Sequence, residues 1–428
     1  MKAISIKANI SYEYALSVAL LDILSIAPIL MILGNVIPPF VLKVHQVGFG
    51  LALLLAVGVL TMQSRTQVFL AVAAIFLVVQ SLYAQHVDPI ESFDFLFGPI
   101  ALLAIIVILE RGIVSREVLR SRRKLFFLLC MVPISIGILQ YFHIVPVTFL
   151  NAQYINYYYE GSLKLERING FFYHGNELVV LSYFFFLNMA YGKSKERAMF
   201  WMLSFFLFAL ALRYKSLWLT AGIIVSYYVV TISKFGGRLL KTIPKWGYWA
   251  AGLALLTTTA WLLVGYVHEN LAKYGLPFKR ELFTGRGGIW AVYLEAVFQF
   301  RWYEHLIGGG LGSEFQLFGD HMSAKAFYPY QVNPNTTVRP HPHNPWIGYY
   351  VNAGLCGILL LIYILRQWLN SFRKLQGSVL EKAFSFIVIV LPFLTFGVTI
   401  YITDMAIYWL CLGFTLINVQ YKSVLMEL

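Results

Sequence analysis

Apolar stretches long enough to cross a lipid bilayer recur along this chain of 428 residues, and they set the main limit on its fold. Hydrophobic residues make up 59% of the sequence and charged residues only 12%. Soluble domains carry about 25% charged residues, roughly twice the share in this chain. The composition therefore excludes a soluble globule and predicts a polytopic membrane protein.

Apolar windows of about 17 to 25 residues predict about twelve transmembrane helices. The first window, residues 14–33, has no small-residue cleavage site of the signal-peptide type, so we expect it to remain as a helix. No linker or internal repeat divides the sequence, which predicts a single all-α membrane domain over residues 1–428. The expected spans are 13–33, 40–61, 66–84, 93–109, 125–145, 177–191, 198–212, 216–232, 247–267, 345–365, 383–400 and 404–420.

Lysine and arginine gather in alternate connections between these spans, most densely in the connection at 111–124. The positive-inside rule assigns such connections to the cytoplasm, and both termini with them. A smaller loop at 146–176 and a large loop at 267–344 are then expected to face outward, and the large loop is expected to contain short helices. The net charge of +13 follows from this bias and does not indicate nucleic-acid binding.

Several cations break the rule by lying on the expected outer side. A cation near the hydrocarbon boundary is costly, so it tends to face a polar cavity or a partner anion. Four of them stand in sequence that is poor in acids or rich in glycine: Arg167, Arg213, Arg286 and Arg339. Arg286 also precedes an expected helix at 288–300, where free amides and a guanidinium could together bind phosphate. An ordinary helix start with an exposed arginine is the alternative.

Two histidines stand directly before an expected span, in His341-Pro342-His343-Asn344. An imidazole has a pKa near neutrality and can accept the proton of an attacking hydroxyl, while Asn344 could orient the imidazole or a sugar. Histidines with a structural role at the membrane interface are the alternative. No third and fourth zinc ligand follows at a recognisable spacing, and the three cysteines lie within expected spans, so metal-free chemistry is favoured.

The smaller outward loop contains a tyrosine run at 157–159 and then His174-Gly175-Asn176. Tyrosine rings favour the membrane interface, and the same rings can stack on sugar faces. Both interpretations stay open. The glycine run at 308–312 has no Walker lysine-serine pair, which excludes a nucleotide-binding loop.

In their order along the chain, these motifs resemble the O-antigen ligase and O-antigen polymerase superfamily of bacterial envelope glycosyltransferases. The resemblance covers most of the length. It rests on Arg167 to Phe172 with His174-Gly175-Asn176, on Arg213 near the outer end of a span, on Gly285 to Trp290, on Gly308 to Gly312, and on His341 to Trp346 leading into Val351 to Gly357.

The resemblance implies a metal-independent, inverting glycosyltransferase of the GT-C type in the bacterial inner membrane, with its site at the periplasmic face and no cofactor. The donor would be a glycan linked to undecaprenyl diphosphate. Arg213 and Arg286 look like the arginines that bind the donor diphosphate, and His343 looks like the histidine that activates the acceptor hydroxyl. The further positions expected to contact substrate are Arg167, Arg339, His341, Asn344, Asn176 and His174.

Three activities fit this outline. A ligase, the preferred assignment, transfers the glycan to lipid A-core, whereas a polymerase joins it to a second lipid-linked glycan. A flippase or transporter of lipid-linked glycans is disfavoured, because such proteins carry paired repeats and coupling acids within spans, and Asp22 is nearly alone as a mid-span acid.

Overall fold

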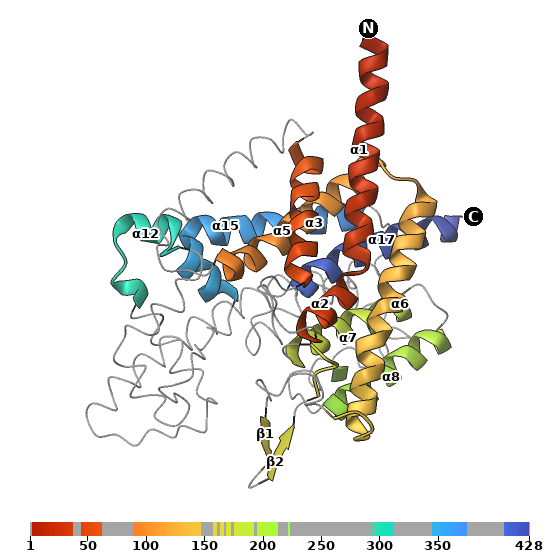
Figure 1. Cartoon of the computed structure of the whole chain (residues 1–428), viewed down its shortest axis with the longest axis vertical. Helices are drawn as coiled ribbons and strands as arrows, with labels where there is room; N and C mark the ends of the chain where they lie inside the picture. The colour runs from red at the N-terminus through yellow and green to blue at the C-terminus, as the bar shows by residue number, and fades with distance from the viewer. Residues whose placement is uncertain are drawn as a thin grey trace, which may run out of the picture.

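The structure is a computed structural model of the whole chain that describes residues 2–36, 44–61, 89–146, 157–160, 163–166, 168–172, 175–191, 195–212, 221–222, 293, 296–310, 345–374 and 406–427 (Figure 1). Helices dominate this part of the chain. They are α1 (Lys2–Ser25), α2 (Ala27–Val36), α3 (Val44–Thr61), α5 (Pro89–Arg111), α6 (Arg116–Tyr141), α7 (Gly175–Ala190), α8 (Lys195–Leu212), α12 (Trp302–Ile307), α15 (Pro345–Lys374) and α17 (Ala406–Glu427). A short antiparallel hairpin joins β1 (Tyr157–Glu160) to β2 (Leu163–Glu166).

Two helices of the described part are long and apolar enough to cross a membrane: Arg116–Tyr141 and Trp346–Phe372. A third span is possible if the bent pair Tyr12–Ser25 and Ala27–Leu33 crosses as one unit, and Val47–Thr61 and Ala406–Gln420 are shorter apolar helices. The helical architecture expected from the composition is confirmed for these residues, and their apolar helices are compatible with a membrane protein. The expected spans at 66–84, 247–267 and 383–400, and all of 216–232 except 221–222, lie outside the described residues, so the number twelve stays a prediction.

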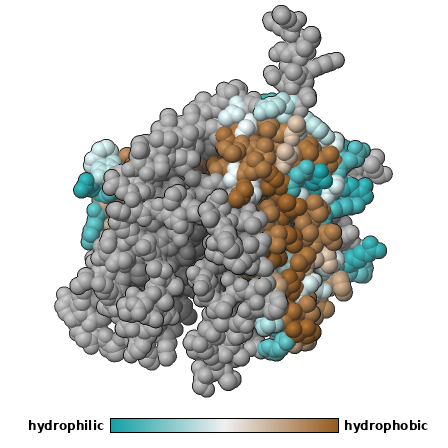
Figure 2. Space-filling view, in the orientation of Figure 1, coloured by the Kyte–Doolittle hydropathy of each residue, from teal (hydrophilic) through white to brown (hydrophobic). Residues whose placement is uncertain are grey.

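One face of α6 is apolar and exposed. Leu128, Met131 and Ile138 are exposed on it, while Phe126 and Cys130 of the same helix are buried. Figure 2 shows a broad hydrophobic area where Figure 1 places α6. Patches of this kind are rare on soluble monomers and suit contact with lipid hydrocarbon.

The expected single span at 13–33 is not one straight helix, because α1 and α2 meet at an angle of 51°. Pro28 explains the break: it lacks an amide hydrogen, and its ring clashes with the carbonyl four residues earlier in a continuous helix. Asp22, just before the break, forms an ion pair with Arg122 of α6. Asp22, the acid that the sequence places within a span, is therefore paired with an arginine from the basic stretch at 111–124.

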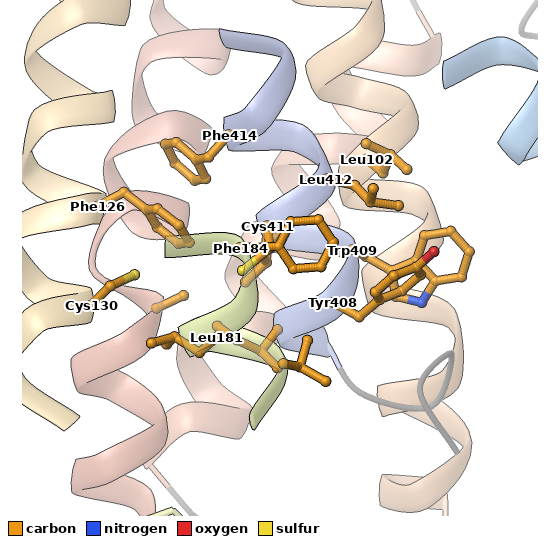
Figure 3. Close-up of a cluster of buried hydrophobic side chains, with 14 of the residues drawn as sticks. Leu102, Phe126, Cys130, Leu181, Phe184, Tyr408, Trp409, Cys411, Leu412 and Phe414 are labelled. Atoms are coloured by element: carbon orange, nitrogen blue, oxygen red, sulfur yellow. The ribbon is translucent and has the colours of Figure 1, made fainter. Parts of the chain in front are cut away.

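The core lies where α17 packs against α5, α6 and α7 (Figure 3). Phe126 of α6 stacks on Phe414 of α17 with ring centroids 3.9 Å apart. Gly98 of α5 lies against the Trp409 ring, and a side chain at position 98 would overlap that ring. Membrane helices approach closely through such small residues, because packing must replace the hydrophobic drive that water would supply.

A chain of hydrogen bonds runs through this apolar core. Arg123 of α6 donates to the Asn418 side chain over 2.6 Å. Asn418 donates in turn to the Asn188 side-chain oxygen over 2.9 Å, and the Asn188 amide donates to the Thr415 hydroxyl over 2.8 Å. These bonds fix the register of α6, α7 and α17, since every partner must stay within hydrogen-bond distance.

The sidedness expected from the basic connections stays a prediction, and one described contact joins two helix ends. Ser371 near the end of α15 donates to Glu110 near the end of α5. This pair joins two helix ends that the positive-inside rule assigns to one side. In Figure 1 the chain ends lie at the top and right, whereas the hairpin and α12, from the two expected outward loops, lie at the bottom and left.

The hairpin β1–β2 is a small addition to the all-α architecture, which holds for the rest of the described residues. Tyr158 pairs with Leu165 in its register, and the tyrosine run forms β1. Aromatic residues favour strands, and in the sequence two residues, Gly161-Ser162, separate the strands, a spacing typical of hairpins. The tyrosine run therefore had a strand signal beside its interface and sugar-stacking interpretations.

Candidate functional site

Asn176 is the one predicted site residue within the described part of the chain. It lies half-buried in the first turn of α7. The structure does describe two backbone segments that adjoin predicted site residues in the sequence, the turn at Asn169 and the break in α15 at Gly354, and we call them the supports of the candidate site. The mutual arrangement of the predicted residues stays a prediction. The predicted residues outside the described ranges are Arg167, His174, Arg213, Arg286, Arg339, His341, His343 and Asn344.

The first support is the turn at Asn169, which follows position 167 and leads toward α7. Gln140 near the end of α6 clamps this turn: its side-chain oxygen accepts from the backbone amides of Asn169 and Gly170, over 3.2 and 2.9 Å. The Gln140 amide donates to the Asn169 side chain over 3.0 Å. Gln140 thus uses its acceptor and its donor on one short segment.

The shape of this turn depends on a glycine. Gly170 has φ +59°, and a β carbon there would lie 2.6 Å from the carbonyl oxygen of Pro133 in α6. Ile168 and Phe172 on either side are buried. The segment 168–172 therefore packs into the bundle along α6, although the sequence places it in an outward loop.

The second support is a break in α15, nine residues after the helix begins at Pro345. Gly354 adopts φ +59° and ψ −154°, which is not helical. The glycine run that follows α12 packs against this break: Gly309 donates to the Val351 carbonyl over 2.8 Å, and Gly310 donates to the Asn352 carbonyl over 3.2 Å. The carbonyls at the break are bonded in this way. Two motifs that are separate in the sequence, at 308–312 and 351–357, are in contact.

His305 of α12 and Tyr350 of α15 form a polar pair that the sequence analysis missed. The His305 Nδ1 atom lies 2.8 Å from the Tyr350 hydroxyl, and both residues are half-buried. Sequence spacing gave no sign of the pair, because 45 residues separate its members. The sequence showed only that a further histidine lies in the large loop. The pair adds a side-chain contact where α12 already packs against α15.

Chemically, the two supports suit a site that needs precise placement of loop residues. In a membrane, irregular backbone is stable only where protein buries it or where it lines a polar cavity. Within the described residues, no group of three or more His, Cys, Asp and Glu side chains is arranged to hold a metal ion. His341 and His343 lie outside those residues, so metal-free chemistry stays a prediction.

Comparisons with known proteins add no identification. No protein-family model matches the chain, and a search of curated proteins finds no match.

Proposed function

We propose that this chain is a membrane glycosyltransferase that moves a glycan from undecaprenyl diphosphate to an acceptor sugar at the periplasmic face of the bacterial inner membrane. The observation that carries the proposal is the contact between Gly309-Gly310 and the break in α15. This contact joins two of the resembling motifs, and the break lies one short helical segment after the His341-Pro342-His343-Asn344 motif. The clamped turn at Asn169 supports a third motif in the same way.

The chemistry follows from the charges that develop in the reaction. When the bond to the lipid diphosphate breaks, negative charge accumulates on the departing phosphate, and the anomeric carbon becomes cationic. Fixed guanidiniums stabilise that state more than the ground state, which lowers the barrier. We assign this role to Arg213 and Arg286, with Arg167 and Arg339 as further contacts.

His343 takes the proton of the acceptor hydroxyl in this mechanism, and the anomeric centre inverts. His341, Asn344, His174 and Asn176 contribute contacts to the substrates. Positioning must be accurate, because small displacements of a catalytic group cost large factors in rate. Tight backbone packing at Gly308 and Gly354 would supply that accuracy to the segment before α15.

The test is sugar transfer by the purified chain in liposomes, comparing Arg286→Ala, Arg213→Ala and His343→Ala with the unaltered protein. Arg301→Ala is a matched control in the large loop, since Arg301 is exposed and its guanidinium bonds the neighbouring Tyr303 hydroxyl. We expect losses of about 100-fold or more for the three site variants, typical of removed transition-state contacts, and near-normal transfer for the control. Full activity of Arg286→Ala or His343→Ala would refute the mechanism.

The acceptor decides between two activities of the same donor site. We assign the ligase activity, transfer to lipid A-core, on the basis of the single late His-Asn motif and the size of the large loop. A polymerase would need to hold a second lipid diphosphate, and the outward cations could serve it equally. The glycan ladder of a deletion strain separates the two. Loss of a ligase leaves bare core with accumulated lipid-linked polymer, whereas loss of a polymerase leaves single repeats attached to core.

A further inference from the structure

Three apolar side chains stand exposed at and just before α12, in the large loop. Phe298 is 67% exposed, Trp302 76% and Leu306 44%. Trp302 and Leu306 are four residues apart within α12, a spacing that places side chains on one side of a helix, and Phe298 lies just before the extended residue Arg301 that directly precedes the helix. Exposed aromatic groups of this size on a polar loop call for a partner surface.

The position of α12 indicates what that partner is. The backbone of Leu306 lies directly against Gly354: a β carbon on Gly354 would be 2.5 Å from the Leu306 carbonyl carbon. The residue after Gly354 begins a stripe of exposed apolar side chains on the membrane-capable part of α15, namely Leu355, Leu359, Ile362 and Tyr363. The exposed residue Leu306 therefore adjoins the start of the surface that α15 offers to lipid.

The polar groups of α12 bond within the protein. The Glu304 carboxylate accepts from the Arg301 amide over 2.6 Å, and the Arg301 guanidinium donates to the Tyr303 hydroxyl over 3.0 Å. His305 meets Tyr350 of α15. The helix is thus held on α15 while its large apolar side chains stay uncovered.

We propose that Phe298, Trp302 and Leu306 dock on the bilayer, so that α12 anchors the large loop at the lipid surface beside α15. Tryptophan suits this place because its ring is apolar over most of its area and carries one polar N–H group. The partner is the lipid of the bilayer itself, continuous with the lipid around α15. This proposal depends on the membrane-type fold and is independent of the reaction proposed above.

The test uses spin labels on the full chain in liposomes of phosphatidylethanolamine and phosphatidylglycerol. Cys130 and Cys411 are buried, so a Cys356→Ser background should leave no reactive thiol. Labels are placed by Trp302→Cys and Phe298→Cys, with Gln299→Cys as the matched control, because Gln299 is exposed and polar beside Phe298. Native Cys356, exposed on α15, is the lipid-facing reference in the unaltered chain. Power-saturation measurements compare collisions with oxygen, which concentrates in lipid, and with a water-soluble nickel chelate.

We expect the labels at 298 and 302 to match Cys356, with oxygen collisions exceeding nickel collisions, and the Gln299→Cys label to show the reverse. If the labels at 298 and 302 collide with the nickel chelate as often as the control label does, the proposal is overturned and glycan is favoured as the partner of these rings. To guard against a label that distorts the segment, each cysteine is placed in a separate chain, so that Trp302 stays native in the Phe298→Cys chain. Water exposure of that label alone would equally contradict lipid docking.

Discussion

Gly354 of α15 faces Gly308 so closely that a β carbon on Gly354 would lie 2.6 Å from the Gly308 amide nitrogen. Neither position has room for a side chain, because Gly308 in turn abuts the backbone of Asn352. The loop and the broken helix meet backbone to backbone. This contact fixes how the chain after α12 meets the helix that follows the histidine motif.

Substitution of Gly354 tests this contact. Gly354→Ala adds strain on the order of 1–3 kcal/mol for a backbone conformation that suits only glycine, and about 1–3 kcal/mol more for overpacking. Gly112→Ala is the control: Gly112 has φ +62° but no atom within 4 Å of its β-carbon position, so only strain applies. Equilibrium unfolding in mixed detergent should show the larger loss of stability for Gly354→Ala. Equal losses would contradict the close backbone contact.

Replacement of Gln140 tests the clamp on the Asn169 turn. Gln140→Met keeps the length of the side chain but leaves the amides of Asn169 and Gly170 without their acceptor. A buried amide left unsatisfied costs about 1–3 kcal/mol, so the free energy of unfolding should fall by at least that much. Leu139→Met, at an exposed neighbouring position, should have little effect. If both variants unfold at the same detergent fraction, the clamp does not stabilise the turn.

The buried polar chain makes a quantitative prediction for a double-mutant cycle. Asn188→Leu and Asn418→Leu each remove the bond of 2.9 Å between these side chains. Neutral buried hydrogen bonds in membranes couple by about 0.6 kcal/mol on average and up to about 1.7. We expect a value near the upper end, because Asn418 also accepts from the charged Arg123. Zero coupling in unfolding free energy would mean that the two amides do not interact.

Thiol reactivity tests the packing of the α6–α17 interface. Cys130 and Cys411 are buried there, whereas Cys356 is exposed on α15. In detergent, a membrane-permeant maleimide should modify Cys356 quickly and the other two only after unfolding, as read by mass spectrometry of tryptic peptides. Rapid modification of Cys130 in the folded protein would place it on an open surface and contradict the packed interface.

Much of the helical layout was predictable because it depends on local hydropathy. The expected spans at 93–109, 177–191 and 198–212 lie on helices of the structure, with end shifts of up to four residues, and α17 overlaps the span expected at 404–420 but continues to Glu427. The observed helix boundaries differ from the expected ones where hydropathy gives no signal. For example, α6 begins at Arg116 and not at 125, because Ser115 caps a polar first turn. Pro28 in the sequence indicates the bend between α1 and α2, but an average of hydropathy over the span does not detect a bend.

The supports of the candidate site were not predictable, because they depend on contacts between distant segments. Nothing near Gly354 in the sequence indicates a break in α15, since the break depends on bonds from Gly309 and Gly310. Gln140 reads as an ordinary polar residue near a helix end until its partners at 169 and 170 are known. The motif order pointed to these segments as candidates, whereas the contacts between them are visible only in the folded chain.

Sugar transfer itself is the most direct test of the central claim. The purified chain in liposomes would receive a sugar-labelled glycan on undecaprenyl diphosphate, with lipid A-core and a second lipid-linked glycan offered in separate reactions. We predict that the label moves to lipid A-core and that free undecaprenyl diphosphate appears in equal amount. If folded protein supplied with intact donor transfers the label to neither acceptor, the account is contradicted.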